Sequence, residues 1–357
     1  MNDIPKRLTF VLPGLITVPM GGVKVVNRLA ELLSEKGYMI TLVYPVNLEI
    51  GILQNLRSLL KNYLDKRNNV ATNLYYQPSD KVDAIVINEI SEKYLPDSDY
   101  VIAVGWQTAG AVNSLSGRKG KKFYFLQSFE AYFTGSSKIL ETYKLPLTKI
   151  ALSNWIIKEM VKLGQKAVGP IGNAINPDEF YIDESIEKTN DILMLYHPAK
   201  IKNAKFGLTI LSNLKKQNSK LNATIFSARE PIHKIPEWIK VVIRPEVAEL
   251  RDLYNSSKVY FSTSKWEGWG LTAMEAMACG CSIVAIKNQG VLEFLKNNDN
   301  AFVINEKDKT GAIEKITKLL NNESLREKFL QESNKTLANY SEMEISSRFE
   351  NCLINKG

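Results

Sequence analysis

Residues 259–286, VYFSTSKWEGWGLTAMEAMACGCSIVAI, contain the repeating unit of the fold in its clearest form. The opening run VYFSTS has the length and the aromatic content of a buried strand. A glycine-bearing turn follows, and Thr272 with Glu275 three residues later has the capping-box pattern that predicts a helix over Thr272 to Ala278. The run SIVAI predicts a second strand. A strand, a helix and a strand in this order predict parallel strands joined by a helical crossover.

The same alternation extends in both directions along the 357 residues. In the first half, strand patterns at Leu8–Pro13 and Met39–Pro45 flank a helix pattern at Val23–Lys36, and DAIVIN, DYVIAVG, KFYFLQ and KIALS follow. After a stretch rich in Gly, Pro and Asn, Val168–Phe180, the alternation restarts with ILMLYHP and a helix pattern at Phe206–Lys216. We therefore predict an α/β chain of two Rossmann-like domains, each with an open, doubly wound parallel sheet.

The predicted domain boundary lies in that glycine- and proline-rich stretch. We assign residues 1–175 to an N-terminal domain and 176–335 to a C-terminal domain. Residues 336–357 are expected to form a C-terminal helix that packs back toward the N-terminal domain. Open α/β sheets bind ligands at the carboxyl ends of their strands. Two parallel sheets facing across an interdomain cleft would hold a ligand there, so functional residues are expected in the loops that follow the strands.

Composition argues against several classes of protein. With 45% hydrophobic and 24% charged residues, the chain has an ordinary globular composition. Its 3 cysteines and 2 histidines are too few for a disulfide framework or a closed zinc site, which favours a reducing cytoplasm. No stretch reaches the roughly 18 apolar residues of a membrane span. The glycine pattern of NAD-binding loops and the nucleophile elbow of serine hydrolases are both missing from the sequence.

The net charge of +8 is distributed unevenly. Lys plus Arg exceed Asp plus Glu by 21 minus 14, or 7, in residues 1–175 and by 25 minus 24, or 1, in residues 176–357. The segment 52–67, ILQNLRSLLKNYLDKR, combines leucines at helical spacing with basic residues at their edge (Arg57, Lys61, Lys66 and Arg67). This pattern is typical of an interfacial helix and also of a helix that covers a sheet. An anionic membrane surface is the expected partner, and nucleic acid is disfavoured because no nucleic-acid-binding module is visible.

The loop after VYFSTS carries the strongest candidate site. Gly268 and Gly270 allow a ligand to approach the backbone closely. The helix N-terminus that follows offers amides suited to a diphosphate, those of Gly270, Leu271 and Thr272. Glu267 and Glu275 flank these amides, and their carboxylates accept hydrogen bonds from the hydroxyls of a sugar or a ribose. Without further context, the alternative interpretation is that Glu275 only caps the helix and that Glu267 is a solvated acid of the loop.

The segment KWEGWGLTAMEAMACG closely resembles the E-x7-E block of the retaining glycosyltransferases of family 4, which have the GT-B fold. The resemblance implies that Glu267 contacts the donor sugar, that Glu275 holds the ribose of the nucleotide and that the glycine turn binds the diphosphate. MGGVKVVNRLAELLSEKGY resembles the family's glycine pair after the first strand, which implies that Gly21 and Gly22 let the N-terminal half approach the donor phosphate. Further similar segments are LPDSDYVIAVGWQTA, YFLQSFEAYF, TYKLPLTKIALSNWI, GNAINPDEF and ELRDLYNSSKVYFSTS.

Two places differ from the family pattern. Members commonly have an Arg, and five residues later a Lys followed by Gly, as a cationic clamp on the diphosphate. Here His197 stands in the Arg place and Lys202 in the Lys place, so the resemblance makes Lys202 a catalytic candidate beside Glu267. Lys200 and Lys205 are candidates to compensate for the missing guanidinium, unless this loop is simply solvated.

On the acceptor side, members often have a His where this chain has Gln127 and Glu130. The sequence leaves open which of the two positions the acceptor.

The resemblance implies a retaining hexosyltransferase that moves a sugar from a nucleotide-diphosphate-sugar to a hydroxyl of a glycan or lipid-linked acceptor, in cell-surface polysaccharide or glycolipid synthesis. The donor is a substrate, and neither a cofactor nor a metal is expected. Asp97-Ser98-Asp99 has the D-x-D spacing of metal sites, but it precedes a strand instead of ending one. We expect a cytoplasmic protein, peripheral on the inner face of the membrane. Two alternatives remain open: a sugar-nucleotide epimerase and a catalytically silent GT-B subunit that binds nucleotide or glycan.

Overall fold

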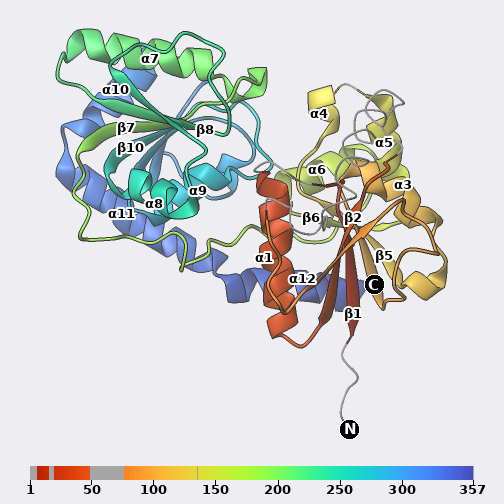
Figure 1. Ribbon diagram of the computed structural model, residues 1–357. Helices are drawn as coiled ribbons and strands as arrows, with labels where there is room; N and C mark the ends of the chain where they lie inside the picture. The colour runs from red at the N-terminus through yellow and green to blue at the C-terminus, as the bar shows by residue number, and fades with distance from the viewer. Residues whose placement is uncertain (1–5, 16–19, 49–75, 135, 357) are drawn as a thin grey trace. The chain divides into compact units, whose positions relative to one another are not determined.

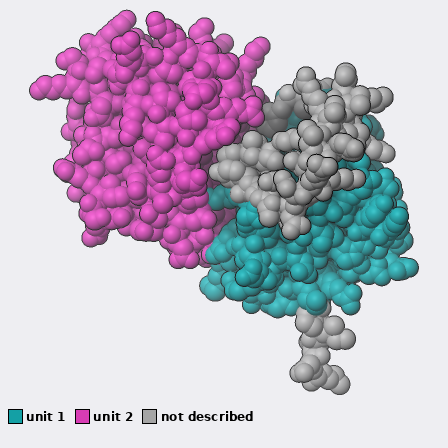
Figure 2. All heavy atoms as spheres, viewed as in Figure 1, with its two compact units in different colours: residues 1–172, 343–357 teal, residues 173–342 magenta. Residues whose placement is uncertain are grey.

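The computed structural model describes residues 6–15, 20–48, 76–134 and 136–356. The chain divides into two compact units (Figures 1 and 2). Unit 1 comprises Met1–Gly172 together with Met343–Gly357, and unit 2 comprises Asn173–Glu342. The basic segment 52–67 lies outside the described residues. Each unit is an α/β layer structure in which helices cover a parallel sheet (Figure 1).

The described part of unit 1 contains a six-stranded parallel sheet with the order β3-β2-β1-β4-β5-β6. The strand order reverses at β1, which pairs with β2 on one side and β4 on the other, as in a doubly wound sheet. The strands are β1 (Arg7–Val11), β2 (Met39–Pro45), β3 (Asp83–Ile87), β4 (Tyr100–Val104), β5 (Lys121–Leu126) and β6 (Thr148–Ala151). The helices are α1 (Gly21–Glu35), α3 (Trp106–Ser114), α4 (Ala131–Thr134), α5 (Ser137–Lys144), α6 (Asn154–Lys162) and α12 (Glu342–Lys356), with a 3₁₀ turn at Gly117–Lys119.

The last helix of the chain, α12, packs on the sheet of unit 1. The buried ring of Phe349 lies 5.9 Å from that of Phe10 in β1 and 5.5 Å from that of Phe125 in β5. The next residue, Glu350, accepts hydrogen bonds from the hydroxyl of Tyr38 and the ammonium of Lys36, each at 3.0 Å. The buried ring of Phe349 therefore packs α12 against β1 and β5, and the hydrogen bonds of Glu350 join it to the segment between α1 and β2.

The described part of unit 2 contains a second six-stranded parallel sheet, in the order β12-β11-β10-β7-β8-β9. The strands are β7 (Asn190–Leu195), β8 (Ala223–Ser227), β9 (Ile239–Ile243), β10 (Ser257–Ser262), β11 (Ser282–Ile286) and β12 (Ala301–Ile304). The helices are α7 (Ala204–Gln217), α8 (Val247–Asn255), α9 (Leu271–Ala278), α10 (Lys309–Leu320) and α11 (Glu323–Leu337), with 3₁₀ turns at Lys200–Lys202, Val291–Glu293 and Ala338–Tyr340. Two parallel six-stranded sheets confirm the predicted fold class.

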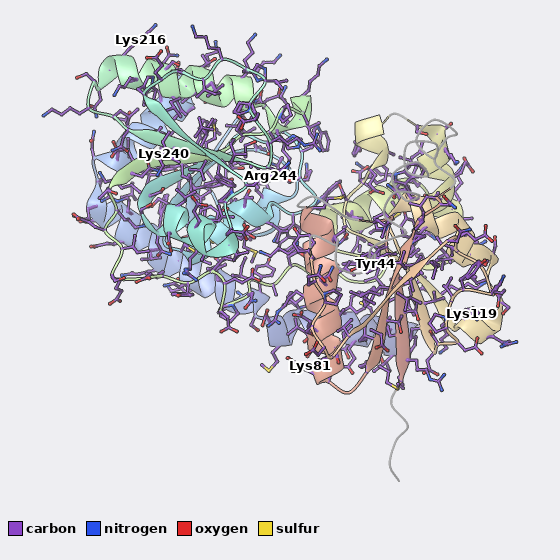
Figure 3. The ribbon with its side chains drawn as sticks, viewed as in Figure 1. Tyr44, Lys81, Lys119, Lys216, Lys240 and Arg244 are labelled. Carbon is purple, nitrogen blue, oxygen red and sulfur yellow. The ribbon has the colours of Figure 1, made fainter. Side chains whose placement is uncertain are left out.

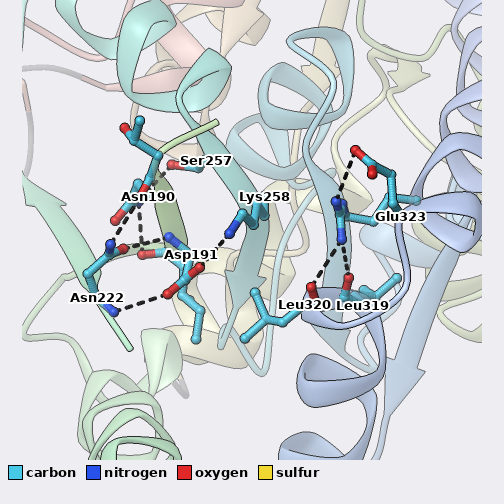
Figure 4. A network of polar contacts seen from close by, with 11 residues as sticks. Asn190, Asp191, Asn222, Ser257, Lys258, Leu319, Leu320 and Glu323 are labelled. Atoms are coloured by element: carbon cyan, nitrogen blue, oxygen red, sulfur yellow. Dashed lines mark hydrogen bonds and ion pairs between the residues drawn. The ribbon is translucent and has the colours of Figure 1, made fainter. Parts of the chain in front are cut away.

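Polar contacts join the amino ends of the central strands of unit 2 (Figure 4). The Asp191 carboxylate accepts hydrogen bonds from the ammonium of Lys258 (2.9 Å) and from the backbone amide of Asn222 (3.2 Å). In return, the side-chain oxygen of Asn222 accepts from the amide of Asp191 (2.7 Å). In the same view, Arg326 donates to the carbonyl of Leu319 and so caps the end of α10. These contacts fix one edge of the sheet, and the loops at the opposite, carboxyl edge carry the candidate site.

Candidate functional site

The glycine turn between β10 and α9 ends at Gly270, which has a φ of +105° and is the N-cap of the helix. A side chain there would be strained, and its Cβ would lie 2.8 Å from Cγ1 of Val291. The helix begins at Leu271, because the amides of Ala273 and Met274 are the first to donate back, to the Gly270 carbonyl. The amides just before them point out of the helix N-terminus, where they and the helix dipole favour an anion.

The predicted capping box is wrong. No side chain caps α9. The Thr272 hydroxyl instead accepts a hydrogen bond from the hydroxyl of Tyr260 on β10, at 2.9 Å. Glu275 is buried and accepts a hydrogen bond from the Tyr254 hydroxyl of α8 at 3.2 Å. Both side chains that the pattern assigned to the cap are thus taken by tertiary partners, and the left-handed Gly270 starts the helix instead.

Glu267 lies in the same turn, and its carboxylate forms an ion pair with Lys202. The Lys202 ammonium is 2.6 Å from Oε1 of Glu267, and the two side chains are 22% and 16% exposed. Lys202 comes from the turn after β7, and Glu267 from the turn after β10, the strand that pairs with β7. Because the pair is only partly exposed, it is screened by water less than a surface ion pair and holds both charges in place.

Backbone contacts hold these two turns together. The Lys265 amide donates to the carbonyl of Ile201 (2.8 Å), and the Thr263 hydroxyl donates to the carbonyl of Lys202 (2.7 Å). Asn288, after β11, donates to the Ser264 carbonyl at 2.9 Å. A Cβ on Gly290 would lie 2.5 Å from the Glu267 carbonyl oxygen, so only glycine fits there. No pattern in the sequence predicted these supporting residues.

His197 follows β7 in the place of the expected arginine. Its Nδ1 accepts a hydrogen bond from the Ala199 amide at 3.1 Å. Burial lowers the pKa of the imidazole, and the positive charges of Lys202 and Arg229 lower it further, against the opposing effect of Glu267. His197 is therefore a neutral ring at pH 7, with Nε2 as its proton donor.

The remaining residues of this loop differ in their exposure. Asn203 has a φ of +54°, a left-handed conformation that Asn tolerates and that suits the Gly of the family pattern. Lys200 and Lys205 are exposed. Among the three candidate lysines, Lys202 is therefore the one that the structure brings to Glu267.

Unit 1 contains the acceptor-side candidates Gln127 and Glu130 and also the donor-side glycines Gly21 and Gly22. Helix α1 begins at Gly21, and the Gln127 side chain donates to the Gly22 carbonyl at 2.9 Å. A Cβ on Gly22 would lie 2.7 Å from Oε1 of Gln127, so this glycine allows the close approach.

Glu130 accepts a hydrogen bond at 3.2 Å from the Trp106 amide, at the start of α3. Burial raises the pKa of Glu130 to about 7, against the lowering effect of that hydrogen bond. Its own amide donates to the Tyr143 hydroxyl at 2.9 Å. A carboxyl group that titrates near neutral pH at the carboxyl end of β5 is a candidate for contact with a substrate hydroxyl.

The D-x-D pair has structural partners at the amino end of β4. Asp97 forms ion pairs with Lys119 (2.8 Å) and Arg118 (3.1 Å), and Asp99 accepts from the Arg7 amide at 2.7 Å. Figure 3 labels Lys119. In the part of the chain that the structure describes, no three His, Cys, Asp or Glu side chains gather as metal ligands would. No helix among those residues has the length and apolar character to cross a membrane.

The part of the chain that carries the candidate site is similar to known sequences. The family model "Glycosyl transferases group 1" matches residues 178–336, which include Lys202, Glu267 and Glu275. The chain is 31% identical over 87 residues to the capsular polysaccharide biosynthesis glycosyltransferase CapM of Staphylococcus aureus, and 32% identical over 91 residues to the sucrose synthase of Melioribacter roseus. These segments cover 24% and 25% of the chain but only 23% and 12% of the two relatives.

Comparison with solved structures shows the fold over nearly the whole chain. HepE of Anabaena, in complex with UDP and glucose, superposes with a TM-score of 0.73 over 98% of this chain and 100% of that one, at 14% identity. S. aureus TarM, solved as a G117R mutant with fondaparinux, α-GlcNAc-glycerol and UDP, gives a TM-score of 0.76 over 98% and 100%, at 11% identity. At these identities the likeness establishes the GT-B fold alone.

Proposed function

We propose that this protein is a retaining glycosyltransferase that moves a hexosyl group from a nucleotide-diphosphate-sugar to a hydroxyl of a glycan or lipid-linked acceptor. The observation that carries the proposal is the 2.6 Å ion pair between Lys202, from the turn after β7, and Glu267, in the turn that leads to the N-terminus of α9. The helix amides and the Lys202 ammonium suit a negatively charged group, and the Glu267 carboxylate suits a hydroxyl. The ligand that fits them has an anionic part linked to a part with hydroxyls. A sugar diphosphate has both.

Each residue has a role in this proposal. The amides at the start of α9 and the Lys202 ammonium stabilise the diphosphate as the bond between sugar and phosphate breaks. Glu267 accepts a hydrogen bond from a sugar hydroxyl, and Glu275, held by Tyr254, accepts from the ribose. The acceptor oxygen bonds to the anomeric carbon on the face that the phosphate leaves, and its proton passes to the departing phosphate oxygen. No protein nucleophile is needed.

The acceptor side of the proposal rests on unit 1. Glu130, with its pKa near 7, is the residue we expect to contact the acceptor hydroxyl, while Gln127 holds the start of α1. The structures similar to this chain include one with a glycan ligand and a glycosylated glycerol, and one of the similar sequences is named for capsular polysaccharide biosynthesis. Both support a cell-surface polysaccharide or glycolipid as the product.

The excess of 7 positive charges in residues 1–175 supports an acceptor at an anionic membrane surface. Each Lys or Arg near such a surface adds about 1 kcal/mol of attraction. Sedimentation with anionic and neutral vesicles at low and high salt tests this part of the proposal. We expect salt-sensitive binding to the anionic vesicles alone, and equal binding to both kinds, or to neither, would favour an acceptor in solution.

A donor screen tests the proposed function. A ligand at 100 times its Kd adds about 2.7 kcal/mol to the free energy of unfolding, so UDP-, GDP- and dTDP-sugars are compared by thermal stabilisation. The stabilising donor is then incubated with acceptors, in the presence of EDTA, and the anomeric configuration of the product is read by NMR. We expect transfer without added metal and a product with the donor's configuration. Turnover of the donor sugar without an acceptor would favour the epimerase, and binding without any turnover would favour the silent subunit.

A further inference from the structure

Strands β7 and β8 end side by side, so the loops that follow them start together at the carboxyl edge of unit 2. Leu195 pairs with Phe226, and the amide of Tyr196 donates to the Phe226 carbonyl at 2.8 Å. His197 follows one strand and Arg229 the other. The loop after β8 is therefore the neighbour of the Lys202 turn on one side, as the glycine turn is on the other.

The backbone around Arg229 is held in place by its neighbours. The Ser227 hydroxyl donates to the Arg229 carbonyl at 2.6 Å and accepts from the Arg229 amide at 3.2 Å. Arg244, after β9, donates from its amide to the Ser227 carbonyl (2.7 Å) and from Nε to the Ala228 carbonyl (3.0 Å). Figure 3 labels Arg244. Arg244 thus supports the loop with its side chain. Arg229 is exposed, and its guanidinium takes no part in any hydrogen bond or ion pair with the described residues.

Two lysines at this end of the sheet are neutralised by ion pairs. Lys202 is paired with Glu267, and Lys265 is paired with Glu306 at 2.6 Å. His197 is neutral, because burial and nearby positive charges lower its pKa. A diphosphate between a nucleoside and a sugar is negatively charged on both phosphates, and these paired or neutral side chains balance little of that charge. Lys200 and Lys205, in the same loop as Lys202, are exposed.

We propose that Arg229 is the second cation on the donor diphosphate, beside Lys202, and that Arg244 positions the loop that carries it. The inference rests on the proposed function and deepens it by naming a further donor-binding residue. The positive charge of Arg229 already acts on His197, whose pKa it helps to lower. A guanidinium has the planar fork that binds two phosphate oxygens at once, which the neutral ring of His197 lacks.

Isothermal titration of the full chain with UDP, GDP and dTDP, and with the matching nucleosides, tests the proposal. With the diphosphate that wild type binds, Arg229→Gln is expected to weaken affinity about tenfold or more, and Arg229→Lys less, because it keeps the charge but loses the fork. Affinity for the nucleoside should not change. The control is Lys216→Gln, which removes one exposed charge near the C-terminal end of α7, at the opposite edge of the sheet, and is expected to bind like wild type (Figure 3).

Two outcomes would overturn the assignment of Arg229. One is a diphosphate affinity of Arg229→Gln within about twofold of that of the Lys216→Gln control. The other is an equal loss for nucleoside and diphosphate, which would place Arg229 at the base. A wild-type protein that binds none of the three diphosphates would instead contradict the proposed function itself, and the assignment of Arg229 with it.

Discussion

The ammonium of Lys202 lies 2.6 Å from a carboxylate oxygen of Glu267, although 65 residues separate the two in the sequence. Parallel pairing of β7 with β10 brings together the turns that follow these strands. The ammonium and the carboxylate neutralise each other, and both side chains are only partly exposed. In the proposed function, Lys202 of this pair is the cation that meets the donor diphosphate.

Replacement of Lys202 by Ala should lower donor affinity and kcat/KM by about tenfold or more, because a partly buried cation on the diphosphate is lost. Lys200→Ala and Lys205→Ala are the matched controls, since each removes one lysine of the same loop, and of the three lysines Lys202 is the one paired with Glu267 in the described structure. Release of nucleoside diphosphate under subsaturating donor measures the effect. Similar small losses of kcat/KM at all three positions would mean that this loop is an ordinary solvated surface and does not bind the donor.

Glu267→Gln and Glu275→Gln should each cost about 1.5 to 3 kcal/mol in transition-state stabilisation, the scale of a charge-assisted hydrogen bond. The amide keeps the volume of the carboxylate, and in Glu275→Gln its oxygen still accepts from Tyr254, so the fold should persist. Steady-state kinetics and a melting curve separate the two effects. Glu314→Gln, at an exposed position of α10, serves as the control, and wild-type turnover in both site variants would show that the site is wrongly assigned.

Glu130→Gln should change how stability depends on pH. The pKa of Glu130 is raised to about 7 in the folded state from a value of 4.5, so the folded protein holds a proton there that the unfolded chain releases. Wild type therefore loses stability as pH rises from about 4.5 to 7, and the variant lacks this loss. We expect the variant to melt at a higher temperature relative to wild type at pH 8 than at pH 5. A difference that does not depend on pH would mean that Glu130 ionises normally.

Phe349→Ala should destabilise the protein by about 3 to 5 kcal/mol, because it removes a fully buried ring between β1 and β5. Ile354→Ala on the same helix is the control, since Ile354 is 48% exposed and should cost about 0.5 kcal/mol or less. Urea unfolding measures both. Equal midpoints for the two variants would contradict the packing of α12 on this sheet.

The sequence predicted the fold class because its signal is local. Each apolar run, such as SIVAI, and each helix pattern lies within a short stretch of sequence. The alternation of these strands and helices then implies parallel sheets. Glu267 and Glu275 were found through a resemblance, and the structure places both beside the start of α9.

What the sequence could not predict depends on tertiary contacts. Thr272 and Glu275 have the spacing of a capping box, but their side chains accept hydrogen bonds from Tyr260 and Tyr254 instead. A local sequence pattern cannot predict such tertiary hydrogen bonds. Gly290 comes 23 residues after Glu267 yet lies against its carbonyl oxygen. The sequence Asn-Gln-Gly, which ends at Gly290, indicates a turn, but it does not show which part of the backbone lies against that turn.

The most direct test of the account is release of nucleoside diphosphate from UDP-, GDP- and dTDP-hexoses with a panel of glycan and lipid-linked acceptors, for wild type and the Lys202→Ala/Glu267→Gln double variant. Removing both members of the ion pair avoids an unpaired buried charge, so the double variant should fold like wild type. The account predicts acceptor-dependent release by wild type from one class of donor and at least about a hundredfold less by the double variant. Undiminished release by the folded double variant, or no release by wild type from any of these donors and acceptors, would contradict it.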